Sequence, residues 1–200
     1  MMGDVRNTIP VAFAMLPSLM LAMVSGALSA LSLVFPVFFF LIWIAFVPLF
    51  LSLRAQPIGK RFFFGLVAGV TYFSGACHWV WWSTTQFFAV SPASASALFL
   101  GFLVWSGVVF ALFAMALWQP SSAGRQLLFA AFLWVVLEHY FPMVLPWQFG
   151  TILQPDLMAI QLAEATGAAG LSFLIVFVNG LFFCAYEQRR ERRVDRKSVV

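Results

Sequence analysis

Charged residues are scarce in this chain, and one long stretch has none at all. Lys, Arg, Asp and Glu make up 9% of the 200 residues, whereas an ordinary soluble domain contains about 25%. No charged side chain occurs between Arg61 and Arg125. Because a membrane-spanning helix needs about 20 apolar residues, this gap holds two spans and a turn. The scarcity of charge excludes a soluble globular domain and indicates a protein that crosses a membrane several times.

Cysteine and histidine are also rare, which limits the kinds of site that the chain can build. Its two cysteines, Cys77 and Cys184, lie far apart in apolar runs without metal-ligand residues beside them. A disulfide framework is therefore not expected, and buried apolar thiols are the better interpretation. Neither histidine has neighbours typical of a ligand set. We expect no metal and no cofactor.

Apolar and aromatic residues fill most of the chain. Hydrophobic residues make up 63% of it, with 25 Phe and 8 Trp, and the mean hydropathy is +0.97. The first apolar run continues well past a group of small residues at 25–30, so an uncleaved helix is expected there rather than a signal peptide. We expect an all-α fold, a polytopic membrane helix bundle of about six transmembrane helices over residues 11–186. The predicted spans are residues 11–31, 35–53, 62–82, 93–118, 127–141 and 162–186.

Lys and Arg occur only in every second connection between these spans. The second loop holds three basic residues and the fourth holds Arg125, while the other loops, including a long outer loop at 142–161, hold none. Arg6 precedes the first span, and the segment 187–200 is strongly basic. The positive-inside rule therefore predicts that residues 1–10 and 187–200 are both cytoplasmic. The basic tail lacks aromatic residues for stacking on bases, so we expect it to contact anionic lipid headgroups rather than nucleic acid.

One carboxylate stands out near the outer end of the fifth span. Glu138 lies about 18 Å from the inner start of that helix. A carboxylate inside an apolar span is costly, so such a residue is a functional candidate. The alternative is an interfacial carboxylate that is hydrogen-bonded to His139 or to a tryptophan. Trp81 and Trp82, which follow Trp79, are typical of an aromatic belt at the membrane surface.

Several of these residues form an ordered series of short motifs. Trp134 and Glu138 make a Trp-x-x-x-Glu pair, which is followed by a Pro-Trp-x-x-Gly loop and a Gly-x-x-Gly-small-Phe-Leu helix that ends near Asn. This series, together with the segment around Trp79, resembles the membrane domain of bacterial apolipoprotein N-acyltransferases over roughly residues 20 to 188. The residues that match the later motifs are Pro146, Trp147, Gly150, Gln161, Gly167, Gly170, Phe173 and Asn179.

The resemblance implies a function in bacterial lipoprotein biosynthesis at the inner membrane. Members of that family transfer an acyl chain from a phospholipid to the α-amino group of a diacylglyceryl lipoprotein, and their membrane helices hold the lipids. The candidate residues for holding substrate or lipid are Trp79, Glu138, His139, Pro146, Trp147, Gln148 and Gly150. The candidates for close helix packing are Gly65, Gly69, Gly167, Gly170 and Asn179, the first two because they form a small-xxx-small step.

The chain departs from the family in the part that carries the chemistry. The family continues with a further span, a nitrilase-like domain bearing a Glu, Lys and Cys triad, and a last helix, whereas this sequence stops at Val200. We therefore expect no catalytic residue in this chain, with the catalytic domain supplied by another chain or the sequence a truncated product. Cys77 does not make up for the loss, because adjacent helical residues point about 100° apart and His78 is directed away from it. Where the family often has Arg after the Glu, this chain has His139.

Two other functions fit part of the pattern. A non-catalytic lipid-binding or assembly module would retain the same helices without supporting the reaction. A small transporter is less consistent with the sequence, because transporter sites lie near the middle of the membrane, on broken helices with paired charges. Here the acidic and aromatic candidates gather toward one side, and no internal repeat is evident.

Overall fold

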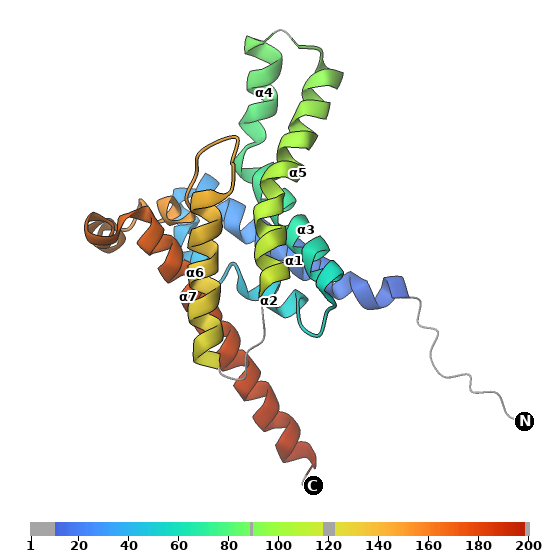
Figure 1. Cartoon of the computed structure of the whole chain (residues 1–200), viewed down its shortest axis with the longest axis vertical. Coiled ribbons are helices and arrows are strands. Elements are labelled where there is room, and N and C mark those ends of the chain that lie inside the picture. The colour runs from blue at the N-terminus through green and yellow to red at the C-terminus, as the bar shows by residue number, and fades with distance from the viewer. Residues whose placement is uncertain (1–10, 89, 118–122, 199–200) are drawn as a thin grey trace, which may run out of the picture.

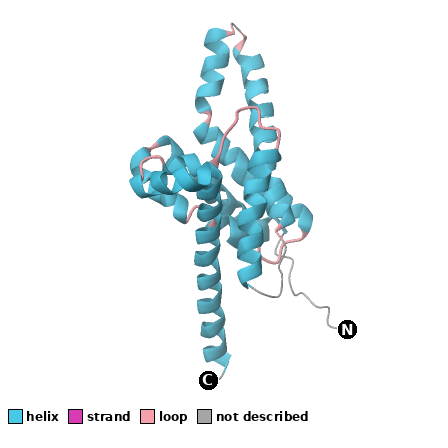
Figure 2. Ribbon diagram, turned by 60° about the vertical axis from the view of Figure 1, so that its left-hand side comes forward, coloured by secondary structure: helices cyan, strands magenta, loops and turns pink. Residues whose placement is uncertain are grey.

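The structure, a computed structural model, describes residues 11–88, 90–117 and 123–198. These residues form helices and no strands (Figure 2), which confirms the all-α fold class. The predicted segment 1–10 lies outside the described residues. In chain order the elements are α1 (Val11–Val34), η1 (Pro36–Trp43), α2 (Val47–Ser52), α3 (Ile58–Ala76), α4 (His78–Phe87), α5 (Pro92–Ala116), α6 (Ala123–Tyr140), η2 (Phe149–Leu153) and α7 (Leu157–Ser198).

The apolar helices stand where the sequence predicts membrane spans, but their lengths differ. Three stretches in the described residues are long and apolar enough to cross a membrane, namely Met15–Val34, Pro92–Ala116 and Leu157–Arg190. α3 and α4 together make a fourth if they form one span that is bent by 55°. The segment from η1 to α2 and the 18-residue helix α6 occupy the second and fifth predicted positions.

α3 lies at the centre of the bundle, between α1 and α5. Its contact with α5 is close because both helices present small residues. A Cβ added to Gly69 would lie 2.7 Å from the backbone of Gly107, and a Cβ added to Gly65 would lie 2.5 Å from the Phe110 carbonyl oxygen. A Cβ added to Gly26 of α1 would likewise meet the Ala68 carbonyl oxygen of α3. The structure thus places Gly65 and Gly69 where backbone-to-backbone packing requires glycine.

The second predicted span, residues 35–53, is helical and apolar but is not one continuous α-helix. A 3₁₀ helix ends at Trp43, a turn follows, and the short helix α2 begins at Val47. Asn179 of α7 binds this break: its Oδ1 accepts from the Phe46 backbone N–H at 2.8 Å, and its Nδ2 donates to the Ile42 carbonyl at 2.8 Å. Asn179, predicted as a packing residue, therefore hydrogen-bonds the backbone groups that the break leaves without helical partners.

The third predicted span is also interrupted. α3 ends at Ala76, Cys77 lies at the junction, and α4 turns away by 55°. α4 then runs beside the first half of α5, where Trp81 Nε1 donates to Ser96 Oγ at 3.1 Å. Figures 1 and 2 both show this pair of helices rising beyond the rest of the bundle.

The last helix contains a kink that changes the interpretation of two glycines. Gly167 has a φ of 69°, which is outside the helical region, and a Cβ there would meet nothing within 4 Å. Its prediction as a packing residue is wrong, because its contribution is the backbone conformation of the kink. A Cβ at Gly170 would meet the Thr166 side chain across the same kink rather than another helix.

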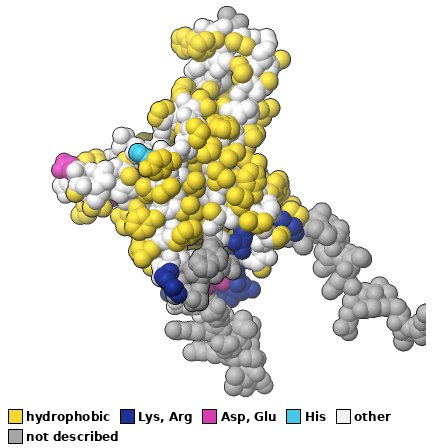
Figure 3. All heavy atoms as spheres, in the orientation of Figure 1, with side chains coloured by type: hydrophobic (Ala, Val, Ile, Leu, Met, Phe, Trp, Pro, Cys, Tyr) yellow, Lys and Arg dark blue, Asp and Glu magenta, His cyan; other side chains and the backbone are white. Residues whose placement is uncertain are grey.

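The basic side chains of the described residues gather at one end of the molecule (Figure 3). Arg54 forms an ion pair with Glu187 at 2.8 Å. Arg61 donates to the Leu117 carbonyl at the end of α5 at 2.7 Å. This one-sided distribution agrees with the basis of the orientation prediction, and the cytoplasmic placement of the termini stays a prediction.

Gly69 and Gly101 have different surroundings, which predict different effects of replacing each glycine with alanine. Gly69→Ala should lower the free energy of unfolding by about 1–3 kcal/mol, because the backbones of α3 and α5 must move apart. Gly101→Ala in α5, where nothing lies within 4 Å of the new Cβ, should be neutral or stabilising because alanine favours helix. Unfolding in detergent followed by circular dichroism measures both. Equal effects at the two positions would contradict the close packing of α3 on α5.

Removing the Asn179 amide should destabilise the broken span. Asn179→Leu keeps a similar volume but leaves the Phe46 N–H and the Ile42 carbonyl without a partner, at a cost of about 2–4 kcal/mol. The exposed Gln188 on the same helix gives the matched control, and Gln188→Leu should leave the unfolding free energy unchanged. A stable Asn179→Leu protein would show that the break does not depend on this side chain.

Candidate functional site

Glu138 is buried at the end of α6, and one of its carboxylate oxygens accepts two hydrogen bonds. Oε1 accepts from Trp134 Nε1 at 2.8 Å and from the Phe149 backbone N–H at 2.6 Å. Oε2 has no hydrogen-bond partner among the described residues. The interpretation of Glu138 as a carboxylate bonded to a tryptophan therefore accounts for Oε1, and Oε2 keeps its capacity to accept.

The chain after α6 turns back into the bundle as η2. Phe149 is fully buried there, and the Gly150 N–H donates to Ser172 Oγ of α7 at 2.8 Å. A Cβ at Gly150 would meet the Ala168 carbonyl and the Leu171 side chain, so the Gly of the Pro-Trp-x-x-Gly motif permits this approach. The prediction of one long outer loop over residues 142–161 is wrong for this part, because η2 belongs to the core.

Five of the seven candidate substrate residues line one open pocket of about 570 Å³. Polar groups at the end of α6 and along the following segment share its wall with aromatic and aliphatic side chains. The pocket can therefore contact both parts of an amphiphilic molecule. Its lining residues are Glu138, His139, Tyr140, Phe141, Pro142, Met143, Pro146, Trp147, Gln148 and Thr151.

Trp147 lines both this pocket and a second, smaller cavity of about 210 Å³. Its ring lies 5.1 Å from that of Tyr72, 5.6 Å from Phe73 and 5.0 Å from Phe149, measured between centroids. These contacts fix the indole between the core and the two hollows. Of the candidate residues, Trp147 and the neighbouring Pro146 line both spaces.

Trp79 and Gly150 do not line the larger pocket. Trp79 is 50% exposed on α4 and lines the smaller cavity together with Cys77. His78 is exposed, and its Nδ1 donates to the Gly75 carbonyl at 2.9 Å. In the described residues no group of three His, Cys, Asp or Glu side chains is placed to hold a metal ion.

Sequence reasoning missed two buried polar residues of the smaller cavity. Tyr72 and Ser106 line it, and their hydroxyl oxygens have no partner among the described residues. Trp147 Nε1, which also belongs to a lining residue of this cavity, has none there either. A tyrosine and a serine within long apolar runs were the available signal, but single hydroxyls are common in membrane helices because they can bond to the preceding turn.

Comparison with known proteins identifies the family. The family model for the apolipoprotein N-acyltransferase N-terminal domain matches residues 25–181. The chain belongs to this family. The match covers every residue that lines the larger pocket, from Glu138 at the end of α6 to Thr151 in η2.

Individual members of the apolipoprotein N-acyltransferase family agree with this assignment. The chain is 33% identical to the Geobacter metallireducens enzyme over 82% of its own length and 32% of the relative's. It is 32% identical to apolipoprotein N-acyltransferase 2 of Leptospira interrogans, over 71% of the chain and 24% of the relative. For the Gloeobacter violaceus enzyme the identity is 31%, over 75% of the chain and 31% of the relative. The chain thus spans about a third or less of these relatives.

The bonds of Glu138 predict a graded effect of substitution. Glu138→Ala leaves the Trp134 and Phe149 N–H groups unpaired and should cost about 2–4 kcal/mol of stability. Glu138→Gln retains a carbonyl oxygen that can accept from both, so it should cost much less. Limited proteolysis of the segment 142–156, combined with thermal unfolding, measures the effect. Glu164→Ala, at an exposed carboxylate of α7, is the control, and equal sensitivity of all three variants would contradict the assigned role.

Proposed function

We propose that this chain is the substrate-holding membrane domain of an apolipoprotein N-acyltransferase system in the bacterial inner membrane. It holds a phospholipid and a diacylglyceryl lipoprotein while an acyl chain passes between them. A nitrilase-like catalytic domain, present elsewhere in the system, performs the transfer. The family assignment supports a place in an N-acyltransferase system, and the larger pocket supports the substrate-holding role.

The observation that carries this proposal is the larger pocket. It brings Glu138, His139, Pro146, Trp147 and Gln148 together from the end of α6 and from the re-entrant segment. Such a mixture of polar and apolar lining suits a molecule with a polar head and hydrocarbon chains. The smaller cavity behind Trp147, which is mostly apolar, has room for part of an acyl chain.

The architecture supports a holding role rather than a complete catalytic one. A thiol nucleophile needs a base within hydrogen-bond reach. The two cysteines of the chain line different hollows, Cys77 beside Trp79 and Cys184 at the basic end of the bundle. The nearest base candidate in sequence, His78, uses Nδ1 to bond Gly75. The proposal therefore assigns these helices to binding and assigns the covalent steps to the catalytic domain.

The proposal predicts that Trp147 matters for acylation more than an exposed tryptophan does. The chain would be co-expressed with the remaining region of the Geobacter metallireducens relative, and the N-terminal peptide of a diacylglyceryl lipoprotein would be weighed by mass spectrometry. Trp147→Ala should reduce the fraction that gains one acyl chain by about tenfold, because a side chain that lines both hollows is lost. Trp82→Ala, on the exposed surface of α4, should leave the fraction unchanged.

Different outcomes separate the candidate functions. Equal acylation by the Trp147 and Trp82 variants would remove the case for this pocket. Phospholipid binding by the chain, with no acyl transfer in the presence of any catalytic partner, would favour a non-catalytic lipid-binding or assembly module. Solute flux in proteoliposomes would favour a transporter.

A further inference from the structure

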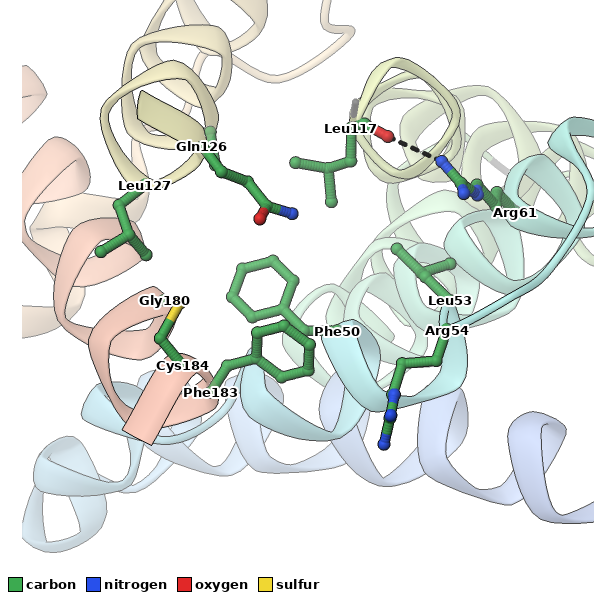
Figure 4. A pocket seen from close by; sticks show the side chains of 11 residues that line it. Phe50, Leu53, Arg54, Arg61, Leu117, Gln126, Leu127, Gly180, Phe183 and Cys184 are labelled. Carbon is green, nitrogen blue, oxygen red and sulfur yellow. Dashed lines mark hydrogen bonds between the residues drawn. The ribbon is translucent and has the colours of Figure 1, made fainter. Parts of the chain in front are cut away.

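A third pocket lies at the basic end of the bundle, away from the candidate substrate site (Figure 4). Gln126 lines it from α6, 12 residues or about 18 Å along that helix from Glu138. Segments from α2, α3, the end of α5, α6 and α7 meet around it. Its lining residues are Phe50, Leu53, Arg54, Arg61, Leu117, Gln126, Leu127, Ala130, Gly180, Phe183 and Cys184.

Arg61 brings a positive charge to this pocket that no carboxylate neutralises in the described part of the chain. Its Nε donates to the Gln56 carbonyl at 2.9 Å and its Nη1 donates to the Leu117 carbonyl at 2.7 Å. Both acceptors are uncharged, and Nη2 has no acceptor among the described residues. Arg54 differs, because Glu187 pairs with it at 2.8 Å. A partly buried guanidinium with neutral partners and a free donor favours an anionic ligand.

Gln126 and the size of the hollow narrow the chemistry of that ligand. Figure 4 shows the Gln126 amide directed into the hollow and the Arg54 guanidinium directed away from it. The hollow measures about 50 Å³, which is room for about three or four non-hydrogen atoms by the measure in which one water needs about 10–15 Å³. The phosphorus and the two unesterified oxygens of a phosphodiester have that size, and such oxygens are acceptors suited to the Arg61 and Gln126 donors.

The remaining walls are apolar. The rings of Phe50 and Phe183 lie 5.7 Å apart between centroids, and Leu53, Leu127 and Ala130 complete the surface. A free phosphate ion gains nothing from such walls, whereas the glycerol and first chain carbons of a lipid do. Basic pockets between transmembrane helices at the level of the headgroups are typical sites for anionic lipids.

We propose that this pocket binds an anionic phospholipid, with the unesterified phosphate oxygens in the hollow at Arg61 and Gln126 and the glycerol and acyl chains leaving it past Phe50 and Phe183. The site is separate from the acyl-transfer substrate site. Its occupant is a lipid that the protein retains, which links α2 and α3 to α6 and α7 at the basic end. The proposal does not depend on the function proposed above.

The test compares which lipids the whole chain retains from a mixed bilayer. The protein is placed in nanodiscs of equal parts phosphatidylglycerol and phosphatidylcholine, released into the gas phase, and weighed with its bound lipids. Wild-type protein should retain phosphatidylglycerol in preference to phosphatidylcholine. Arg61→Gln should reduce this preference by about fivefold, the effect of one basic residue near an anionic lipid.

A matched variant separates a specific site from general surface charge. Arg189→Gln removes the same charge from an exposed position of α7 that does not line the pocket, and it should retain the preference. Gln126→Leu, which changes no charge, should also weaken it. Equal losses in the Arg61 and Arg189 variants, or no preference in the wild type, would overturn the proposal.

The two native cysteines give a second readout that does not rely on substitution. Cys184 lines this pocket and Cys77 lines the cavity near Trp79. Adding phosphatidylglycerol to phosphatidylcholine nanodiscs should slow thiol labelling of Cys184 severalfold relative to Cys77. Protection of Cys184 by inorganic phosphate in detergent, without lipid, would assign the site to a free anion, and equal slowing of both thiols would contradict a site at Arg61.

Discussion

Inside a membrane, backbone N–H and C=O groups that lie outside a regular helix need hydrogen-bond partners. Four side chains supply such partners here. Asn179 bonds the Phe46 N–H and the Ile42 carbonyl, and Ser25 Oγ donates to the Ala45 carbonyl at 2.7 Å. Glu138 and Ser172 accept from the two N–H groups that begin η2. In hydrocarbon each unpaired group would cost several kcal/mol. The two irregular segments are therefore possible only because α1, α6 and α7 each present a polar side chain at the required place.

The same breaks create the aromatic centre of the molecule. Once its N–H is held, Phe46 projects among rings from three other segments, with centroid distances of 4.9 Å to Trp134, 5.1 Å to Phe149 and 5.9 Å to Phe110. A continuous helix would distribute successive side chains around its axis and would present one face to the neighbouring helices. The interruption instead places one ring at the meeting point of α5, α6 and η2. The wall of the candidate substrate pocket is built on this centre.

Hydropathy was enough to predict the helical class and the positions of the apolar segments, because the absence of charge is a local property. It did not reveal the break at residues 44–46, since the sequence is apolar on both sides of the break and the stabilising amide belongs to a distant helix. Glu138 was found because a carboxylate in an apolar run is unusual. Ser172 was missed because one serine carries no such signal.

The distance along the chain between Asn179 and the break it binds bears on how the protein is made. Phe46 and Asn179 are 133 residues apart, which at a synthesis rate of 5–20 residues per second corresponds to roughly 7 to 27 s. Until the last helix is synthesised and inserted, the backbone at the break has no amide to bind it. A chain that stops before Asn179 would therefore contain all the early helices and still lack the amide that binds the break in the second span.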